Sequence, residues 1–178
     1  MDTKKIFSDV ILIPVQNFRD DRGSFKETFN KLDFENIGLF TEFTQDNVSF
    51  SKLKGTLRGL HYQKDEFSQT KLVSVLCGSI YDVFLDIRPN SNTFGQFGSL
   101  SLDPDAGSIL IPKGFAHGFC TLEDNTIVSY KVDNYYNKDS ESGVIWNDKE
   151  LNINWPIDGD PIISNKDREL PSFADLGK

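Results

Sequence analysis

The sequence predicts an all-β fold, a barrel or sandwich of short strands with a few short helices. Runs of β-branched and aromatic residues alternate with Gly, Pro, Asn and Asp along the chain, as is typical of such folds. Helix signals are sparse: residues 31–38 favour two turns that end at Gly38, and residues 172–176 favour one turn. Because no amphipathic helices separate the strands, a doubly wound α/β fold is excluded.

The clearest strand pattern lies at residues 71–87, where every second residue from Val73 to Cys77 shares one face. After a Gly-Ser pair the alternation resumes through residue 87, which predicts a β-hairpin with both faces partly buried. Further strands are predicted at 97–102, 107–112, 117–122 and 126–133.

Length and composition narrow the class of protein. A chain of 178 residues without linker or repeat suits one domain with a full core, so we expect residues 1–178 to form a single domain. The net charge of −8 argues against a nucleic-acid partner, whereas a small anionic ligand needs only a few well-placed cations.

Several further features indicate a cytoplasmic protein with no membrane partner. No apolar run approaches the ~20 residues that span a bilayer. The N-terminal residues show no cleavage site of a secretory signal. Cys77 and Cys120 both lie in apolar runs and are predicted to be buried, reduced thiols.

The chain has two histidines, His61 in LRGLHYQ and His117 in IPKGFAHGFCTL. A histidine in a strand is more often structural than catalytic. Arg58 and His61 lie on opposite faces of an extended strand unless a bulge intervenes, so their relation stays open. Neither histidine has a neighbour at metal-ligand spacing, and no metal is expected.

Four cations stand beside aromatic residues or carboxylates rather than in charge runs: Arg22, Arg58, Lys71 and Lys166. Each alone is equally well explained by a surface ion pair, which contributes little to stability. If they converge, they suit a pyrophosphate and a developing enolate. Tyr136 favours either rim packing or a stacking surface for a base, and Tyr130 follows the pattern of a core residue.

Over about residues 10–168 the chain resembles the dTDP-4-dehydrorhamnose 3,5-epimerase family. The motifs that carry the resemblance, in order, are FRDDRGSFKETFN, TQDNVSFSKLKGTLRGLHYQ, KLVSVLCGSIYDVFLDIRPNSNTFGQF, ILIPKGFAHGFCTL, YKVDNYY, SGVIWND, INWP and SNKD. The resemblance implies a cupin-type double-stranded β-helix (jelly roll) that works as a homodimer without metal or cofactor. It also implies a dTDP-linked 4-keto-6-deoxyhexose as substrate.

The resemblance also assigns roles to residues of this chain. His61 matches the catalytic base, and Asp167 matches the carboxylate that pairs with it. Tyr130 matches the acid that protonates from the other face, and Lys71 matches the cation that stabilises the enolate. Positions that match substrate-binding residues are Arg22, Glu27, Gln45, Asn47, Arg58, His117, Glu141 and Lys166, together with Tyr136 as the aromatic that stacks on thymine.

These residue types suit proton transfer beside a ketone. Removing the C–H proton leaves negative charge on the C4 oxygen, which a lysine placed in advance stabilises. Histidine is the side chain whose charge changes nearest neutral pH, and a carboxylate on its other nitrogen determines the tautomer. A second acid on the opposite face is needed to return the proton with inversion.

The expected function is therefore inversion of C3 and C5 of dTDP-4-keto-6-deoxy-D-glucose, giving dTDP-4-keto-L-rhamnose. Val48 and Ser74 depart from the residues that many relatives carry, and they leave a single-centre epimerase for another nucleotide-linked 4-keto sugar as the alternative. A 3,4-ketoisomerase is disfavoured by the Tyr130 and Asp167 matches. A non-catalytic binding module is disfavoured because a binder needs no pair of proton donors and acceptors.

Overall fold

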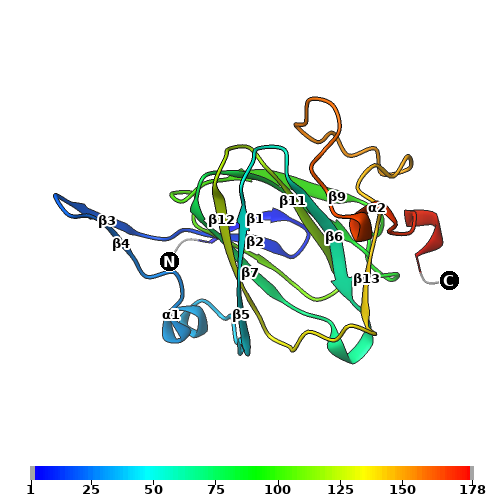
Figure 1. The fold of residues 1–178 in the computed structure, drawn as a ribbon. Helices are drawn as coiled ribbons and strands as arrows, with labels where there is room; N and C mark the ends of the chain where they lie inside the picture. The colour runs from blue at the N-terminus through cyan, green and yellow to red at the C-terminus, as the bar shows by residue number, and fades with distance from the viewer. Residues whose placement is uncertain (1–2, 177–178) are drawn as a thin grey trace.

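Two β-sheets face each other in the computed structural model, which describes residues 3–176 (Figure 1). The six-stranded sheet has the order β1-β2-β10-β7-β12-β5, with strands Lys4–Phe7, Val10–Ile13, Ser108–Ile111, Lys71–Cys77, Thr126–Val132 and Gln45–Ser51. The five-stranded sheet has the order β13-β6-β11-β8-β9, with strands Glu141–Gly143, Leu57–Gln63, Phe115–Thr121, Ile80–Asp86 and Phe97–Leu102. All pairs of neighbouring strands in these two sheets are antiparallel. The all-β prediction is confirmed.

Among residues 3–176, helical structure is confined to short segments, as predicted. The α-helices are α1 (Lys31–Asn36) and α2 (Asn165–Arg168), and the 3-10 turns are η1 (Asp65–Phe67) and η2 (Phe173–Asp175). The predicted helix at 31–38 corresponds to α1, and the predicted turn at 172–176 corresponds to η2. The four strands predicted between residues 97 and 133 correspond to β9, β10, β11 and β12.

The predicted hairpin at 71–87 is wrong. β7 pairs with β10 and β12 in one sheet, whereas β8 pairs with β11 and β9 in the other. The connection between them passes from one sheet to the other through Gly78, which has φ +74. A Cβ at this glycine would lie 2.4 Å from Thr126 Oγ1, so only glycine fits the turn. The side-chain pattern of a strand indicates which of its faces are buried, but it does not specify the neighbouring strands.

Two hydrophobic clusters explain why both faces of β8 are buried. Phe84 points between the sheets, into a cluster shared with β7, β10, β11 and β12. Val83 and Leu85 point the other way, into a cluster that the segment after β13 completes with Trp155 and Phe173. The C-terminal segment therefore covers the outer face of the five-stranded sheet.

The two thiols differ in exposure. Cys120 lies in the cluster under the C-terminal segment, where burial raises the pKa of its thiol to about 11. Cys77, the last residue of β7, is exposed, so the prediction that it is buried is wrong. Both thiols are free, as predicted.

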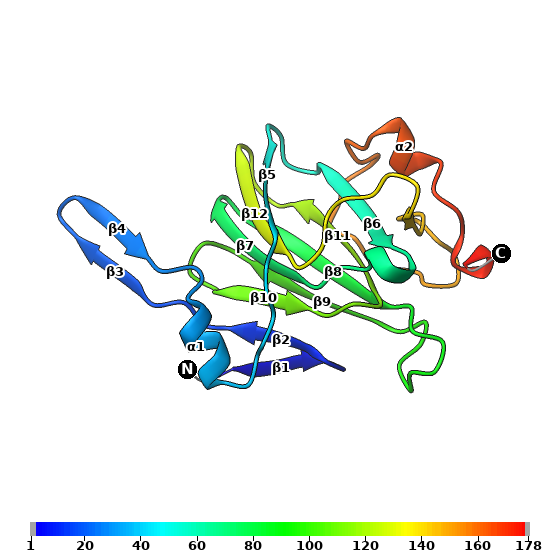
Figure 2. The ribbon, with the colours of Figure 1, turned by 90° about the horizontal axis from the view of Figure 1, so that it is seen from below.

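A hairpin arm extends from the barrel, as Figures 1 and 2 both show. It consists of β3 (Asn17–Asp20) and β4 (Gly23–Lys26), which pair only with each other among the described strands. The arm exposes Phe18 and Phe25, and Arg22 lies in its turn.

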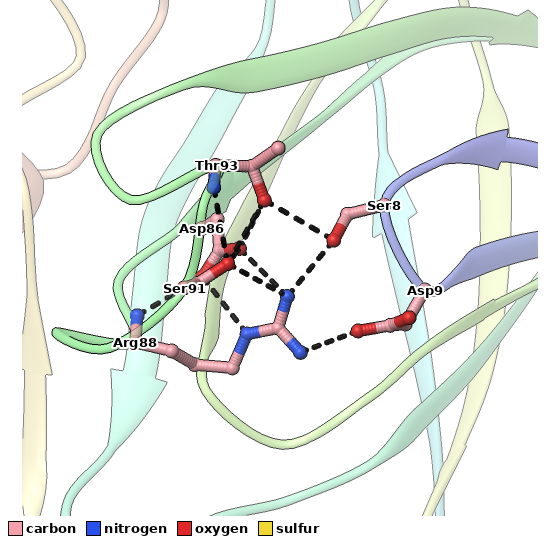
Figure 3. Close-up of polar contacts among 6 residues, drawn as sticks. All are labelled: Ser8, Asp9, Asp86, Arg88, Ser91 and Thr93. Atoms are coloured by element: carbon pink, nitrogen blue, oxygen red, sulfur yellow. Dashed lines mark hydrogen bonds and ion pairs between the residues drawn. The ribbon is translucent and has the colours of Figure 1, made fainter.

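A polar cluster joins the loop after β8 to the turn between β1 and β2 (Figure 3). The buried carboxylate of Asp86 accepts hydrogen bonds from Arg88 Nη2, Ser91 Oγ and Thr93 Oγ1, each at 2.6 Å. Arg88 continues to Asp9 across the β1–β2 turn at 2.6 Å. The cluster ties the two sheets together at the end where these loops meet.

Candidate active site

A cavity of about 810 Å³ lies between the two sheets, lined by residues of β5, β6, β7, β11, β12 and the segment around α2. Eight of the residues that the sequence marks as site residues line it: Arg58, His61, Lys71, His117, Tyr130, Tyr136, Glu141 and Asp167. They come from both sheets, from the loop between β12 and β13 and from the C-terminal segment, so only the tertiary fold brings them together.

A β-bulge places Arg58 and His61 in the same cavity. In the pairing of β6 with β11, His61 lies opposite His117 and Arg58 lies opposite Phe119, so three residues of one strand span two of the other. A Cβ at Gly59 would lie 2.6 Å from the Gly118 backbone, so the strands approach here only because both positions are glycine. The bulge therefore lets both side chains reach the cavity, although they would lie on opposite faces of a regular strand.

His61 and Asp167 form a hydrogen-bonded dyad. His61 Nε2–H donates to Asp167 Oδ1 at 3.0 Å, and the Gly59 backbone N–H donates to Asp167 Oδ2 at 3.0 Å. Burial alone would raise the pKa of the Asp167 carboxyl, but the bonds from His61 and Gly59 outweigh it and hold that pKa below its usual value. A charged carboxylate only accepts, so the proton lies on Nε2 and the Nδ1 lone pair is free to act as a base.

Lys71 bridges the two sheets at the cavity. Its Nζ, on β7, donates to the backbone oxygen of His61, on β6, at 3.2 Å. Burial lowers the pKa of the Lys71 ammonium to about 8, while the charges of Asp82 and Glu141 act in the opposite direction. At neutral pH the ammonium is therefore charged but poorly solvated, which strengthens its attraction for a developing oxyanion.

A second histidine–carboxylate pair lies beside this lysine. His117 Nε2 donates to Asp82 Oδ2 at 2.8 Å, and both side chains are buried. Within residues 3–176 the other oxygen, Asp82 Oδ1, is buried without a hydrogen-bond partner. The sequence reading did not mark Asp82 as a site residue. The feature that could have marked Asp82 is that it is an acidic residue on the inward face of β8, between apolar neighbours.

Tyr130 reaches the cavity from β12, on the opposite sheet from His61. Burial raises the pKa of its phenol, Arg58 acts against that shift, and Glu141 adds to it. The phenol therefore keeps its proton at neutral pH and is a competent proton donor.

At the rim, Tyr136, Glu141 and Lys166 form a hydrogen-bonded group. Lys166 Nζ lies 2.5 Å from Glu141 Oε2, and the Tyr136 hydroxyl donates to the same oxygen at 2.7 Å. Burial would raise the pKa of Glu141, but bonds from Lys166 and Tyr136 lower it overall. The same bond to Glu141 raises the pKa of Lys166, so the pair is charged.

Gln45 and Asn47 lie on β5 next to this group rather than in the cavity wall. Gln45 Nε2 donates to Asn47 Oδ1 at 2.8 Å, and Asn47 lies opposite Tyr130 in the strand pairing. Lys166 likewise does not line the cavity itself, and contacts it through Glu141.

Arg22 and Glu27 do not join the cavity of their own chain. Arg22 lies in the turn of the β3–β4 arm, where it pairs with Asp20 at 2.5 Å. Glu27 follows β4 and accepts a hydrogen bond from Asn30 Nδ2 at 3.0 Å. The arm extends from the barrel instead of folding back over it (Figures 1 and 2).

Neither a metal cluster nor a membrane span is found in the described part of the chain. Within residues 3–176, no group of three or more His, Cys, Asp or Glu side chains is arranged to hold a metal ion. None of the helices among these residues has the length and apolar character needed to cross a bilayer.

Comparisons with known proteins agree on one family. Residues 4–175 match the model of the family described as dTDP-4-dehydrorhamnose 3,5-epimerase. The curated dTDP-4-dehydrorhamnose 3,5-epimerase of Escherichia coli strain K12 is 45% identical over 170 residues, which is 94% of this chain and 91% of that protein.

Solved structures extend the similarity to three dimensions. The Bacillus anthracis dTDP-4-dehydrorhamnose 3,5-epimerase with TDP and PPi bound has 51% identity and a TM-score of 0.89, covering 94% of this chain and 98% of that one. A Legionella pneumophila dTDP-6-deoxy-D-glucose-3,5-epimerase in complex with dTDP-4-keto-L-rhamnose has 38% identity and a TM-score of 0.90, covering 98% and 95%. The predicted cupin-type jelly roll is confirmed.

Proposed function

The chain belongs to the dTDP-4-dehydrorhamnose 3,5-epimerase family, and on that premise we propose that it inverts C3 and C5 of dTDP-4-keto-6-deoxy-D-glucose with His61 as base and Tyr130 as acid. It is thus an isomerase, and its product is dTDP-4-keto-L-rhamnose. The observation that carries the assignment of roles is that His61 and Tyr130 line one cavity from facing sheets, and Lys71 lines the same cavity with its Nζ bonded to the His61 carbonyl oxygen.

The first step is removal of a proton from the carbon beside the C4 ketone. His61 Nδ1 takes the proton, the C–H bond breaks, and the electron pair moves onto the C4 oxygen as an enolate. The Asp167 carboxylate stabilises the imidazolium that forms, because it already accepts the Nε2 proton. Lys71 stabilises the charge on the oxygen, and such electrostatic stabilisation is often the largest contribution to catalysis.

The second step returns a proton to the same carbon from the opposite face. The Tyr130 hydroxyl donates it, a new C–H bond forms, and the enolate electrons return to rebuild the ketone. Tyr130 is left as a phenolate and His61 as an imidazolium, and both are reset by proton exchange with water. The Tyr130 phenol is protonated at neutral pH and reaches the cavity from the sheet opposite His61, which supports this role.

Nucleotide binding is assigned to the rim of the cavity. Tyr136 is 53% exposed, so its ring is available to stack on thymine. We infer that Arg58, His117 and Lys166 bind polar groups of the substrate, with Glu141, Gln45 and Asn47 beside them. Lys71 supplies the positive charge that enolate formation requires, so the proposed reaction uses no metal or organic cofactor.

We further infer that the protein acts as a homodimer in which each arm completes the partner's site. Arg22 and Glu27 lie on or next to the arm and outside their own cavity, so a second copy is the natural recipient. The exposed side chains of Val48, Phe50 and Leu76, all on β5 or β7, supply apolar surface for the contact between copies.

The arm exchange is tested with mixed dimers. An Arg22→Ala, Glu27→Ala double variant and a His61→Ala variant, each inactive alone, are co-expressed with different tags and purified as mixed dimers. If arms act across the dimer, one site of two is complete and turnover recovers to about half of wild type. Arms that act within their own chain give mixed dimers with no recovery.

We infer that residues 1–178 form one catalytic domain working in the cytoplasm, with neither nucleic acid nor membrane as a partner. The net charge of −8 supports the absence of a nucleic-acid partner, because phosphate backbones bind clustered cations.

Deuterium exchange tests the reaction itself. Incubating the wild-type enzyme and substrate in D2O is expected to place deuterium at both C3 and C5. Tyr130→Phe is expected to keep exchange near wild type while inversion falls by about 10²-fold, because His61 still removes a proton and can return it. Deuterium at one carbon only would instead identify a single-centre epimerase, and no deuterium at all would identify a binding module.

A further inference from the structure

The backbone around Tyr136 is held by glutamine side chains instead of by a neighbouring strand. Residues 134–137 belong to no strand or helix. Gln63 Nε2 donates to the Tyr135 carbonyl at 3.0 Å, and the Asn137 N–H donates to Gln63 Oε1 at 2.7 Å. The side-chain amide of Gln63 therefore hydrogen-bonds to the backbone on both sides of Tyr136.

Two more glutamines complete this arrangement. The Tyr136 N–H donates to Gln45 Oε1 at 3.1 Å, and Gln69 Nε2 donates to the Asn134 carbonyl at 2.8 Å. Buried or half-buried peptide groups must find partners, and here side chains of β5, β6 and the β6–β7 connection supply them. The segment is thereby held in one conformation despite its irregular backbone.

Gln63 has no donor left for a ligand. Its Nε2 uses both hydrogens, one on Tyr135 and one on the Phe67 carbonyl at 2.7 Å, and the side chain is 7% exposed. It lines the cavity two residues beyond His61 on β6. A buried amide committed in this way determines where the loop lies, and does not recognise substrate through its N–H groups.

Tyr136, in contrast, is exposed, and its ring has one hydrogen-bonding group, the hydroxyl. Its side chain is 53% exposed, and its one side-chain hydrogen bond within residues 3–176 is from its hydroxyl to Glu141. The ring is therefore oriented from two ends, by the hydroxyl bond to Glu141 and by the backbone that presents it. Ordering a ring before binding lowers the entropic cost of stacking.

We propose that Gln63 is a positioning residue that presents Tyr136 for nucleoside stacking. This proposal rests on the proposed role of Tyr136 at the thymine. Gln63 acts through the loop, so its loss weakens binding of the nucleoside and leaves proton transfer at the sugar intact.

The test uses Gln63→Met, which keeps the length of the side chain and removes its hydrogen bonds. Binding of dTDP and of inorganic pyrophosphate is measured by calorimetry, and kcat and KM are measured with the 4-keto sugar nucleotide. We expect the Kd for dTDP to rise about tenfold, which corresponds to ~1.4 kcal/mol. The Kd for pyrophosphate and kcat should each stay within about twofold, because neither depends on the stacked ring.

A double-mutant cycle with Tyr136→Ala separates positioning from general loosening of the fold. In the Tyr136→Ala background, adding Gln63→Met should change the dTDP Kd by less than about twofold, because the ring it positions is gone. Gln69→Met is the matched control, since it removes one bond farther from Tyr136 and should raise the dTDP Kd by only about two- to threefold.

The outcomes distinguish the two proposals. If Tyr136→Ala binds dTDP as wild type does, the stacking role itself is wrong. If Tyr136→Ala weakens dTDP but Gln63→Met does not, or weakens pyrophosphate equally, or adds its full effect in the double variant, positioning by Gln63 is overturned. Should Gln63→Met not fold, Gln63→Glu, which keeps the acceptor for Asn137, undergoes the same measurements and is judged by the same outcomes.

Discussion

Asp86 and Asp167 are both buried carboxylates with lowered pKa values, yet their partners differ in kind. Asp86 is surrounded by Arg88, Ser91 and Thr93, none of which changes charge near neutral pH (Figure 3). Asp167 is hydrogen-bonded to His61. Histidine is the residue type that changes charge near neutral pH.

The difference separates a structural cluster from a candidate catalytic one. Around Asp86, burial would raise the pKa, but the guanidinium and two hydroxyls outweigh it, and the same ion pair raises the pKa of Arg88. No group of that cluster gains or loses a proton near neutral pH, so the cluster can only hold loops together. Around Asp167, the imidazole of His61 can gain a proton on Nδ1, the nitrogen that does not face Asp167. The buried Asp167 carboxylate therefore supports proton transfer.

The largest expected effect is on the catalytic side of this comparison. His61→Ala should lower turnover by about 10³-fold or more, because the base is gone, and should abolish deuterium exchange at every carbon. Binding of dTDP should change little, whereas the thermal midpoint should fall, because the buried Asp167 carboxylate loses the donor that His61 supplies. Turnover near wild type in this variant would refute the assignment of His61.

The structural cluster should show the reverse behaviour. Asp86→Ala leaves the Arg88 charge without its main partner, and should lower the free energy of unfolding by about 3 kcal/mol. Turnover measured well below the unfolding temperature should stay within about threefold of wild type. Urea unfolding and a turnover assay check both halves, and a variant that is stable but inactive would contradict the comparison.

Acid unfolding tests the contribution of Asp86 to stability. Asp86 has a folded-state pKa below its ordinary value of 3.8, so its stabilisation is present above that value and is lost as pH falls through the folded-state pKa. The gap in stability between wild type and Asp86→Ala should therefore stay constant from pH 7 to about 5 and shrink below about pH 4.

Alkaline pH should act on the cavity through Lys71. Lys71 loses its proton above about pH 8, so turnover should then fall by about tenfold per pH unit, as the neutral amine no longer holds the enolate. Because the folded-state pKa lies below the unfolded value of 10.5, stability should rise with pH between these two values. A pH–rate profile and denaturation at pH 7.5 and 9.5 test both trends. The Lys71→Arg variant remains charged in this pH range. If its turnover falls at the same alkaline pH as that of wild type, the fall belongs to another group.

The smallest expected effect is Thr93→Val, which removes one hydrogen bond to Asp86 while Arg88 and Ser91 remain. The free energy of unfolding should fall by about 1 kcal/mol, with turnover unchanged. A loss as large as that of Asp86→Ala would mean that the cluster depends on the hydroxyl and not on the ion pair.

By itself the sequence determined the class of fold and the candidate residues. Alternation and turn residues predicted an all-β chain and placed β9, β10, β11 and β12 correctly, because strand periodicity is local. Ordered motifs identified the family and marked His61, Lys71, Tyr130 and Asp167, which lie on one cavity.

Only the tertiary structure decided which strands are neighbours and which side chains meet. It separated β7 from β8, placed Arg58 beside His61 through a bulge, paired Asp82 with His117, and left Arg22 outside its own cavity. These outcomes depend on contacts between residues far apart in the chain. A local pattern reports whether a face is buried, and pairing across sheets determines what it is buried against.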